Sequence, residues 1–228
     1  MRDTLPFRGG EINLFPSGVQ DGDAPLVCLL CARGEGPAVR DAALEAGAGP
    51  FHMAAVPVAD WNADLSPWPA PGLRGGEAFG GRADAFLKEL EAALPGLRAA
   101  LRAPDAPCYI AGYSLAGLFS VWALYRTAAF DGAASVSGSL WYPDFAGFLK
   151  SGRPQRKPRR VYLSLGDRES RTRDPLLRRT EDETRALCAA LREMGTESVF
   201  ELNPGGHFQD AEKRMARGVA WIAGIDNK

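Results

Sequence analysis

The sequence predicts an α/β protein in which helices cover both faces of a mostly parallel sheet. Short, continuous apolar runs recur along the chain, and such runs are typical of strands that are buried on both faces. Between several of these runs, apolar residues recur every three or four positions, as they do in amphipathic helices. The 228 residues are 46% hydrophobic and 24% charged, a length and composition that favour one globular domain over 1–228.

The apolar runs are expected to form the strands of the sheet, the last of them with the weakest pattern. In chain order they are Pro25–Cys31, Phe51–Val58, Cys108–Ala111, Gly132–Val136, Val161–Leu165 and Ser198–Leu202. Helices between strands provide the long connections that parallel pairing requires. The earlier segment Thr4–Leu14 is expected to add an antiparallel hairpin at one edge.

Helices are expected in three further places. In the first, a stripe of Phe86, Leu90 and Leu94 is interrupted by Pro95, because proline cannot donate the backbone hydrogen bond of a helix. The second begins at Thr180-x-x-Glu183, which has the form of a capping box, and ends at Gly195; its apolar face is Leu187, Leu191 and Met194. The inner face of the last helix is formed by Ala211, Met215, Val219 and Ile222.

Two irregular stretches, Ala59–Gly81 and Ser137–Arg160, break this alternation. Long loops inside a compact domain are often functional, and loops that follow strands of an α/β sheet lie where such proteins bind ligands. The alternative is that both stretches only cover the surface. We expect them to form the walls of a pocket, for which the candidate residues are Trp61, Trp68, Tyr113 and Trp141.

The most informative motif is Gly-Tyr-Ser-Leu-Ala at 112–116, with Ser114 at its centre. It follows an apolar run and precedes an apolar helix, and this order is typical of a nucleophile elbow, which exposes a serine hydroxyl at a sharp turn. The backbone is crowded at such a turn, so the positions two before and two after the serine need small side chains. Gly112 fits, and Ala116 replaces the commoner glycine. Ser114 is therefore the candidate nucleophile.

A serine hydroxyl needs a neighbouring base to remove its proton, and histidine is suited to that task near neutral pH. The chain contains two histidines. His207 follows the last predicted strand and precedes the last helix, beside Gly205 and Gly206. His52 opens an interior strand, far from the edge where the elbow projects, and is expected to be structural. We therefore assign the base to His207.

A carboxylate should orient the imidazole and stabilise it once it is protonated. For a nucleophile elbow the expected chain order is serine, acid, histidine, and the strand Val161–Leu165 lies in the right interval. It is followed by Gly166, Asp167 and Glu169. The spacing of three residues from Gly166 favours Glu169, and Asp167 can instead accept backbone N–H bonds in the turn. Asp167 stays open as the alternative acid.

The developing negative charge on a carbonyl oxygen also needs hydrogen-bond donors. The backbone N–H of Leu115, directly after the nucleophile, is one candidate. The second is expected from the loop after the first buried strand, where position points to the N–H of Ala32.

Composition argues against several other functions. A net charge of −1 provides no basic field for nucleic acid or an anionic membrane, and no apolar run is long enough to span a bilayer. Residues 1–10 contain no apolar core of the secretory type, and four scattered cysteines do not suggest a disulfide framework, so a cytoplasmic location is expected. The basic run at 153–160 is expected to be a solvated loop, with steering of an anionic substrate as the alternative.

These motifs together resemble the esterase D type of α/β-hydrolase esterases, which includes S-formylglutathione hydrolases, feruloyl esterases, mycolyltransferases and bacterial siderophore esterases. More closely, the chain looks like a subgroup of small bacterial putative esterases. The resemblance covers most of the chain from Pro25 onward and rests on the segments Asp60–Trp68, Ile110–Leu118, Ser137–Pro143, Leu163–Glu169 and Asn203–Phe208.

The resemblance implies an α/β-hydrolase fold with no large cap domain, Ser114 as nucleophile and His207 as base. Some siderophore esterases of the group work with a serine–histidine dyad, so the resemblance leaves the acid open. Many relatives carry Leu-Asp-Gly where this chain has Leu30, Cys31 and Ala32. This departure concerns the second oxyanion donor.

We therefore expect a serine hydrolase that cleaves small-molecule carboxylic esters through an acyl-enzyme and needs no metal or organic cofactor. An acyltransferase or a thioesterase would use the same groups, and a catalytically inactive binding module would keep only the fold. A thiol-redox protein based on Cys28 and Cys31 would need both sulfurs on one exposed face. Strand alternation instead directs them to opposite faces.

Overall fold

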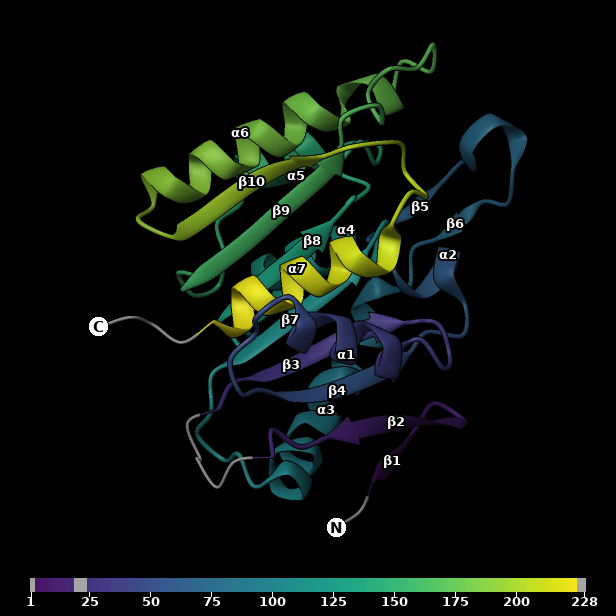
Figure 1. Ribbon diagram of the computed structural model, residues 1–228. Coiled ribbons are helices and arrows are strands. Elements are labelled where there is room, and N and C mark those ends of the chain that lie inside the picture. Colours follow the sequence, from purple (N-terminus) through teal and green to yellow (C-terminus); the bar gives the residue numbers. More distant parts are fainter. Residues whose placement is uncertain (1–2, 19–23, 225–228) are drawn as a thin grey trace.

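The computed structural model describes residues 3–18 and 24–224. The centre of the fold is an eight-stranded sheet (Figure 1). Its neighbouring strands from His52–Pro57 to Glu197–Asn203 all pair in parallel, whereas Thr4–Phe7 pairs antiparallel with Gly10–Phe15, which in turn pairs antiparallel with His52–Pro57. The mostly parallel sheet and its edge hairpin were both predicted. Across the sheet the order is β1 (Thr4–Phe7), β2 (Gly10–Phe15), β4 (His52–Pro57), β3 (Leu26–Cys31), β7 (Cys108–Tyr113), β8 (Gly132–Val136), β9 (Arg160–Gly166) and β10 (Glu197–Asn203).

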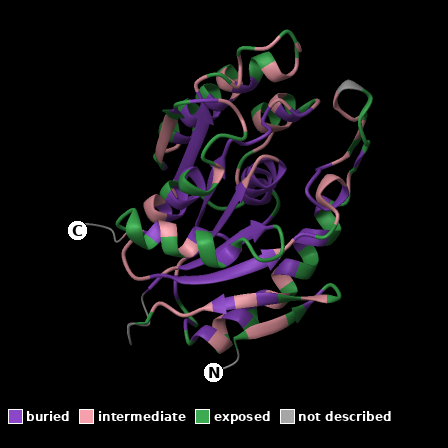
Figure 2. Cartoon of the chain, turned by 45° about the vertical axis from the view of Figure 1, so that its right-hand side comes forward, coloured by how far each residue is buried: buried purple, intermediate pink, exposed green. Residues whose placement is uncertain are grey.

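Helices cover both faces, and the central strands are buried along most of their length (Figure 2). One face packs against α1 (Gly36–Glu45) and α7 (Ala211–Ala223). The other face packs against four helices, which are α3 (Ala83–Leu101), α4 (Leu115–Arg126), α5 (Phe145–Ser151) and α6 (Thr180–Glu193).

The two faces separate the cysteines of the Cys-x-x-Cys sequence. Cys28 belongs to the apolar cluster beneath α3 and α4, and Cys31 belongs to the cluster beneath α1 and α7. Cys28, Cys31, Cys108 and Cys188 are all buried and unpaired by disulfides. Two buried sulfurs on opposite sides of a sheet cannot form the exposed dithiol that a redox function would need.

The expectation that Pro95 interrupts its helix is wrong. α3 continues through Pro95 to Leu101, and Leu97 and Leu101 are buried on the same stripe as Leu90 and Leu94. A proline inside a helix costs about 3 kcal/mol. Burial of each leucine contributes about 1.5–3 kcal/mol, so the two leucines beyond the proline offset that cost.

The capping box at Thr180 is also wrong, although its helix and the stop at Gly195 are right. Thr180 is the first residue of α6, because the 3₁₀ turn η2 (Leu177–Arg179) runs directly into it. Glu183 instead accepts a 2.6 Å bond from the guanidinium of Arg179. Gly195 lies at φ +74°, a conformation that suits glycine after a helix.

Short elements that the sequence pattern did not indicate complete the fold. The buried face of α1 consists of Gly36, Val39 and Ala43, which are too small to give a strong periodic signal. α5 lies inside the irregular stretch 137–160. The irregular stretch 59–81 contains α2 (Trp61–Asp64), β5 (Pro69–Ala70), the 3₁₀ turn η1 (Leu73–Gly75) and β6 (Phe79–Gly80).

The basic run at 153–160 lies away from the end of the sheet that carries Ser114. Arg156 and Arg159 pair with Asp131 at 3.0 and 3.5 Å, and Asp131 immediately precedes β8. Ser114 follows the carboxyl end of β7, which is parallel to β8. The two arginines therefore lie at the opposite end of the sheet from Ser114.

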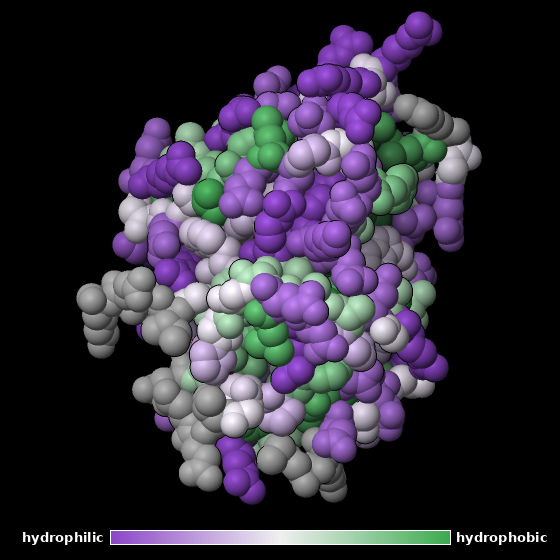
Figure 3. Space-filling view, viewed as in Figure 1, coloured by the Kyte–Doolittle hydropathy of each residue, from purple (hydrophilic) through white to green (hydrophobic). Residues whose placement is uncertain are grey.

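Hydrophilic and hydrophobic residues are interspersed on the face shown in Figure 3, and its hydrophobic areas are small and separate. None of the described helices is both long and apolar enough to cross a membrane. Among the described large hydrophobic residues, the most exposed is Phe208, at 90%, directly after His207. This apolar surface therefore lies beside the candidate base.

Replacing Pro95 by alanine restores a backbone donor inside α3 without moving the leucine stripe. We expect Pro95→Ala to raise the free energy of unfolding by roughly 1–3 kcal/mol in urea denaturation. Gly96→Ala is the matched control, because it improves helix propensity at the adjacent exposed position without adding a donor, and should gain about 1 kcal/mol. A Pro95→Ala protein no more stable than wild type would contradict this account of α3.

Candidate active site

Ser114 stands between the last residue of β7 and the first of α4, in a backbone conformation that few non-glycine residues adopt. Its φ is 58° and its ψ is −120°, which costs of order 1–3 kcal/mol. Bonds from the β8 side hold the turn: Ser114 N donates to Val136 O at 3.0 Å, and Ser139 N donates to Ser114 O at 3.1 Å. The sharp turn leaves the Ser114 hydroxyl at the carboxyl end of the sheet.

The predicted need for small neighbours at this turn has a direct steric cause. A Cβ on Gly112 would lie 2.4 Å from the Cβ of Ala116, closer than two non-bonded carbon atoms pack. Ala116 is accommodated because its methyl group faces the glycine.

His207 comes from the loop that connects β10 to α7. Its Nε2 lies 3.0 Å from Ser114 Oγ, and 29% of its side chain is exposed. The Tyr113 hydroxyl donates to the backbone carbonyl of His207, and burial raises the pKa of Tyr113, which keeps this donor protonated. The structure therefore brings the predicted nucleophile and base into direct contact.

His52 lies at the start of β4, at the opposite end of the sheet. It is 4% exposed, and its Nδ1 accepts a 3.3 Å bond from Ser17 N. Burial lowers the pKa of His52, which favours the neutral ring. This histidine is part of the core, as expected.

The structure separates the two carboxylates that the sequence left as alternatives. Glu169 Oε2 lies 2.7 Å from His207 Nδ1. Asp167 Oδ1 accepts a 2.8 Å bond from Gly205 N and so ties the loop after β9 to the loop after β10. Glu169 thus contacts the imidazole, and Asp167 holds the turn.

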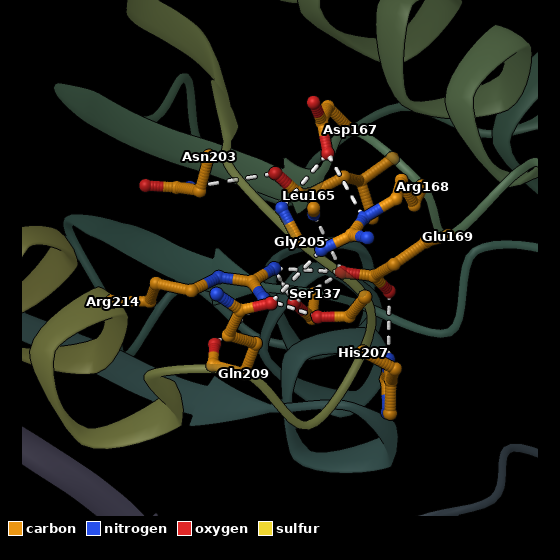
Figure 4. A network of polar contacts seen from close by, with 12 residues as sticks. Ser137, Leu165, Asp167, Arg168, Glu169, Asn203, Gly205, His207, Gln209 and Arg214 are labelled. Atoms are coloured by element: carbon orange, nitrogen blue, oxygen red, sulfur yellow. Dashed lines mark hydrogen bonds and ion pairs between the residues drawn. The ribbon is translucent and has the colours of Figure 1, made fainter.

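The second oxygen of Glu169 is surrounded by donors (Figure 4). Oε1 lies 2.6 Å from Gly166 N, 2.8 Å from Ser137 Oγ and 2.6 Å from a terminal nitrogen of Arg214. Burial alone raises the pKa of Glu169, but the bonds from His207, Gly166 and Arg214 outweigh it and lower the pKa to about 2. The carboxylate is therefore ionised at every pH at which an imidazole acts as a base.

The two expected oxyanion donors differ in availability. Leu115 is the first residue of α4, and N–H groups in the first turn have no acceptor within their helix. Ala32 follows β3, whose pairing of Leu30 with Gly112 places Ala32 level with Ser114. Its N–H already donates to Glu35 Oε2 at 2.9 Å. Ala32 can therefore act as a donor only after the Glu35 carboxylate moves away.

A cavity of about 320 Å³ opens on Ser114 and His207. Its lining is mostly apolar apart from the reacting groups and consists of Leu73, Ser114, Ser139, Trp141, Glu169, Leu177, Thr180, His207 and Phe208. Within residues 3–18 and 24–224, no three His, Cys, Asp or Glu side chains gather as a metal site would require.

The aromatic pocket candidates divide among three places. Trp141 lines the cavity at Ser114, whereas Trp61 and Tyr113 line a second cavity of about 510 Å³ towards α1 and α7. Trp68 lies in neither lining: its Nε1 donates to Pro143 O at 3.0 Å, and its ring packs against Tyr142. Trp68 therefore joins the stretch 59–81 to the stretch 137–160 and does not line the Ser114 cavity.

Sequence reasoning missed Arg214 and Ser137. Arg214 directly precedes Met215, which belongs to the predicted inner face of the last helix. A charged residue beside an inward face was the one sequence feature that could have indicated a buried arginine. Ser137 follows β8 with φ 47°, and it is 1% exposed. No feature of the sequence indicates that Ser137 reaches Glu169.

No family model matches the chain. An uncharacterized protein, YbbA of Bacillus subtilis (strain 168), is 28% identical over 172 residues, which cover 71% of this chain and 68% of that protein. An IroE-like serine hydrolase from Shewanella oneidensis superimposes with a TM-score of 0.73 and 18% identity, over 95% of this chain and 77% of that one.

The enterobactin esterase FES from Shigella flexneri superimposes with a TM-score of 0.65 and 20% identity, over 93% of this chain and 55% of that one. These likenesses show that the chain has the α/β-hydrolase fold, as predicted, and that its structural neighbours include a serine hydrolase and an enterobactin esterase. A large cap domain is not evident in the described residues.

The low pKa of Glu169 links stability to pH. The carboxylate stabilises the folded state fully above its ordinary pKa of 4.5, and this contribution is lost as the pH falls towards 2. The difference in unfolding free energy between wild type and Glu169→Gln should shrink by up to about 3 kcal/mol between pH 6 and pH 2. Thermal or urea unfolding of both proteins across this range measures it, and a constant difference would contradict the assigned contacts.

Proposed function

We propose that this protein is a serine hydrolase that cleaves carboxylic esters through an acyl-enzyme intermediate. The observation that carries the proposal is a chain of two hydrogen-bond contacts. Ser114 Oγ lies 3.0 Å from His207 Nε2, and His207 Nδ1 lies 2.7 Å from Glu169 Oε2. Nucleophile, base and orienting carboxylate in hydrogen-bond contact form the arrangement that activates a serine hydroxyl. The names of the structural neighbours, a serine hydrolase and an esterase, agree with this reaction class.

In the acylation step, His207 Nε2 removes the Ser114 proton as Oγ attacks the ester carbonyl carbon. The carbonyl oxygen becomes an oxyanion and accepts from the Leu115 N–H, and from the Ala32 N–H once Glu35 has moved. Glu169 stabilises the imidazolium through Nδ1. When the tetrahedral intermediate collapses, its bond to the leaving oxygen breaks and His207 returns the proton to the departing alcohol.

Deacylation repeats these steps with water in place of serine. His207 removes a proton from the water, which attacks the acyl carbon, and the proton then returns to Ser114 Oγ as the acid departs. An alcohol or a thiol in place of water would give acyl transfer, and a thioester would enter by the same route. The mostly apolar cavity favours small esters with an uncharged apolar group beside His207.

An inactive binding module on this fold is disfavoured by the position of the base. Such a module predicts a blocked or inward histidine, whereas His207 is 29% exposed, lines the cavity and touches Ser114.

Ser114→Ala removes the nucleophile and should lower kcat by about 10⁴–10⁶ with little effect on the melting temperature. A fluorophosphonate probe should label wild type on the peptide that contains Ser114 and should leave the variant unlabelled, as mass spectrometry can show. Ser151→Ala, which removes a serine of α5, is the control and should keep the label. Wild type that takes up no probe and hydrolyses no ester or thioester of an acyl panel would refute the proposed function.

The two carboxylates should respond differently to neutralisation. Glu169→Gln removes the charge beside the imidazole and should lower kcat by about 10²–10⁴. Asp167→Asn keeps an oxygen that can accept from Gly205 N, so its kcat should stay within about threefold of wild type. Steady-state kinetics on the best ester of the panel measures both, and the reverse order would assign the acid to Asp167.

A further inference from the structure

We propose that Arg214 is a positioning residue that holds Glu169 and the His207 loop in one geometry, and that its charge sets the pH at which the acid–base pair takes up a proton. The inference rests on the proposed function of Ser114, His207 and Glu169. It concerns a residue that contacts neither the nucleophile nor the cavity.

Arg214 lies in the first turn of α7 and is fully buried. One terminal nitrogen of its guanidinium contacts both Glu169 Oε1, at 2.6 Å, and Ser137 Oγ. In Figure 4 the Glu169 carboxylate lies between the Arg214 guanidinium and the His207 imidazole, so one of its oxygens faces the guanidinium and the other faces the imidazole. Rotation of the carboxylate would break both contacts at once, and Arg214 therefore fixes the direction in which Glu169 meets His207.

The other terminal nitrogen of Arg214 holds the loop that carries the base. It donates to Gly206 O at 3.0 Å and to Gln209 O at 3.2 Å, and these carbonyls flank His207 on both sides. The carbonyl of His207 itself accepts from Tyr113, over whose ring the guanidinium lies at 5.6 Å. A planar fork with several donors can serve the carboxylate and the loop together, whereas a lysine ammonium is a single point charge.

The charge of Arg214 also acts on the imidazole. With Arg214 present, the buried arginine and glutamate cancel, and protonation of His207 adds a net positive charge. Without it, Glu169 is an uncompensated carboxylate, which attracts a proton to the pair. A unit charge about 7 Å away in an effective dielectric of about 20 corresponds to a shift of between one and two pH units.

Other charged and titratable groups surround this pair and stay in place when Arg214 is replaced. Tyr113 faces it from β7, and Asp167 and Arg168 face it from the loop after β9. Asp210 precedes α7, and Glu181 of α6 bonds Ser170 next to Glu169. In the described part of the chain, these five groups form no hydrogen bond with the Glu169 carboxylate, whose partners are Gly166, Ser137, His207 and Arg214.

The test compares Arg214→Gln and Arg214→Met, which remove the charge, with Arg214→Lys, which keeps it. The acid limb of kcat/KM against pH should move up by at least about one unit in the neutral variants and stay near its wild-type position in the lysine variant. All three should lower kcat at least tenfold, because none can bridge Glu169 to both loop carbonyls. Methionine fills the buried space and adds no polar group of its own, so it carries the test if the glutamine variant does not fold.

The matched control is Arg217→Gln, which removes the same charge one turn further along α7, where the arginine contacts Asn203. Its acid limb and kcat should stay close to those of wild type. Neutral Arg214 variants that fold but keep the wild-type limb would overturn the proposal, since a merely structural arginine would alter stability and kcat alone. Wild-type kcat in Arg214→Lys would overturn the positioning role.

Nuclear magnetic resonance separates this proposal from the proposed function. The imidazole of His207 can be titrated directly, with His207→Gln to assign its signals, because the chain has only one other histidine. The titration midpoint should rise in Arg214→Gln or Arg214→Met whether or not the protein hydrolyses an ester. An unchanged midpoint in an active enzyme would overturn the inference about Arg214 while leaving the hydrolase proposal standing.

Discussion

The Glu169 carboxylate is a buried charge, and the geometry of the site depends on how that charge is compensated. Only 6% of its side chain is exposed, and burial of an uncompensated carboxylate costs several kcal/mol. Contacts from His207, Gly166, Ser137 and Arg214 satisfy both oxygens. These donors come from the ends of β8 and β9, the loop after β10 and the start of α7, so a single charge fixes four segments that are distant in the sequence.

The nucleophile depends on a different constraint, steric rather than electrostatic. Ser114 has a strained backbone at a turn so crowded that a Cβ added to Gly112 would lie 2.4 Å from the Cβ of Ala116. Close packing supports such strain at sites where a side chain must project from the fold. The two constraints meet at the 3.0 Å contact between Ser114 and His207.

The parts of the site that adjacent residues encode around Ser114, Glu169 and His207 were predictable from the sequence, whereas the contacts between residues distant in the chain were not. The elbow at Ser114, the loop of His207 and the turn of Glu169 each have a local pattern, and their order along the chain brings them to one edge of a parallel sheet. Arg214 and Ser137 contribute through contacts that span 45 and 32 residues, and no local pattern records those. The bond between Ala32 and Glu35 is local, yet backbone donors leave no mark in the sequence. Pro95 was misread because propensity is a local quantity, whereas the burial of Leu97 and Leu101 is a tertiary one.

The bond between His207 Nδ1 and Glu169 is the contact through which the buried charge reaches the reacting atoms, and its proton can be observed directly. In a one-dimensional proton spectrum at low temperature, a bridging Nδ1 proton gives a resonance far downfield of the backbone amides. The account predicts such a resonance in wild type and in Asp167→Asn, and its loss in Glu169→Gln and His207→Gln. A spectrum of the folded wild-type protein without that resonance, or one in which it survives Glu169→Gln, would contradict the account.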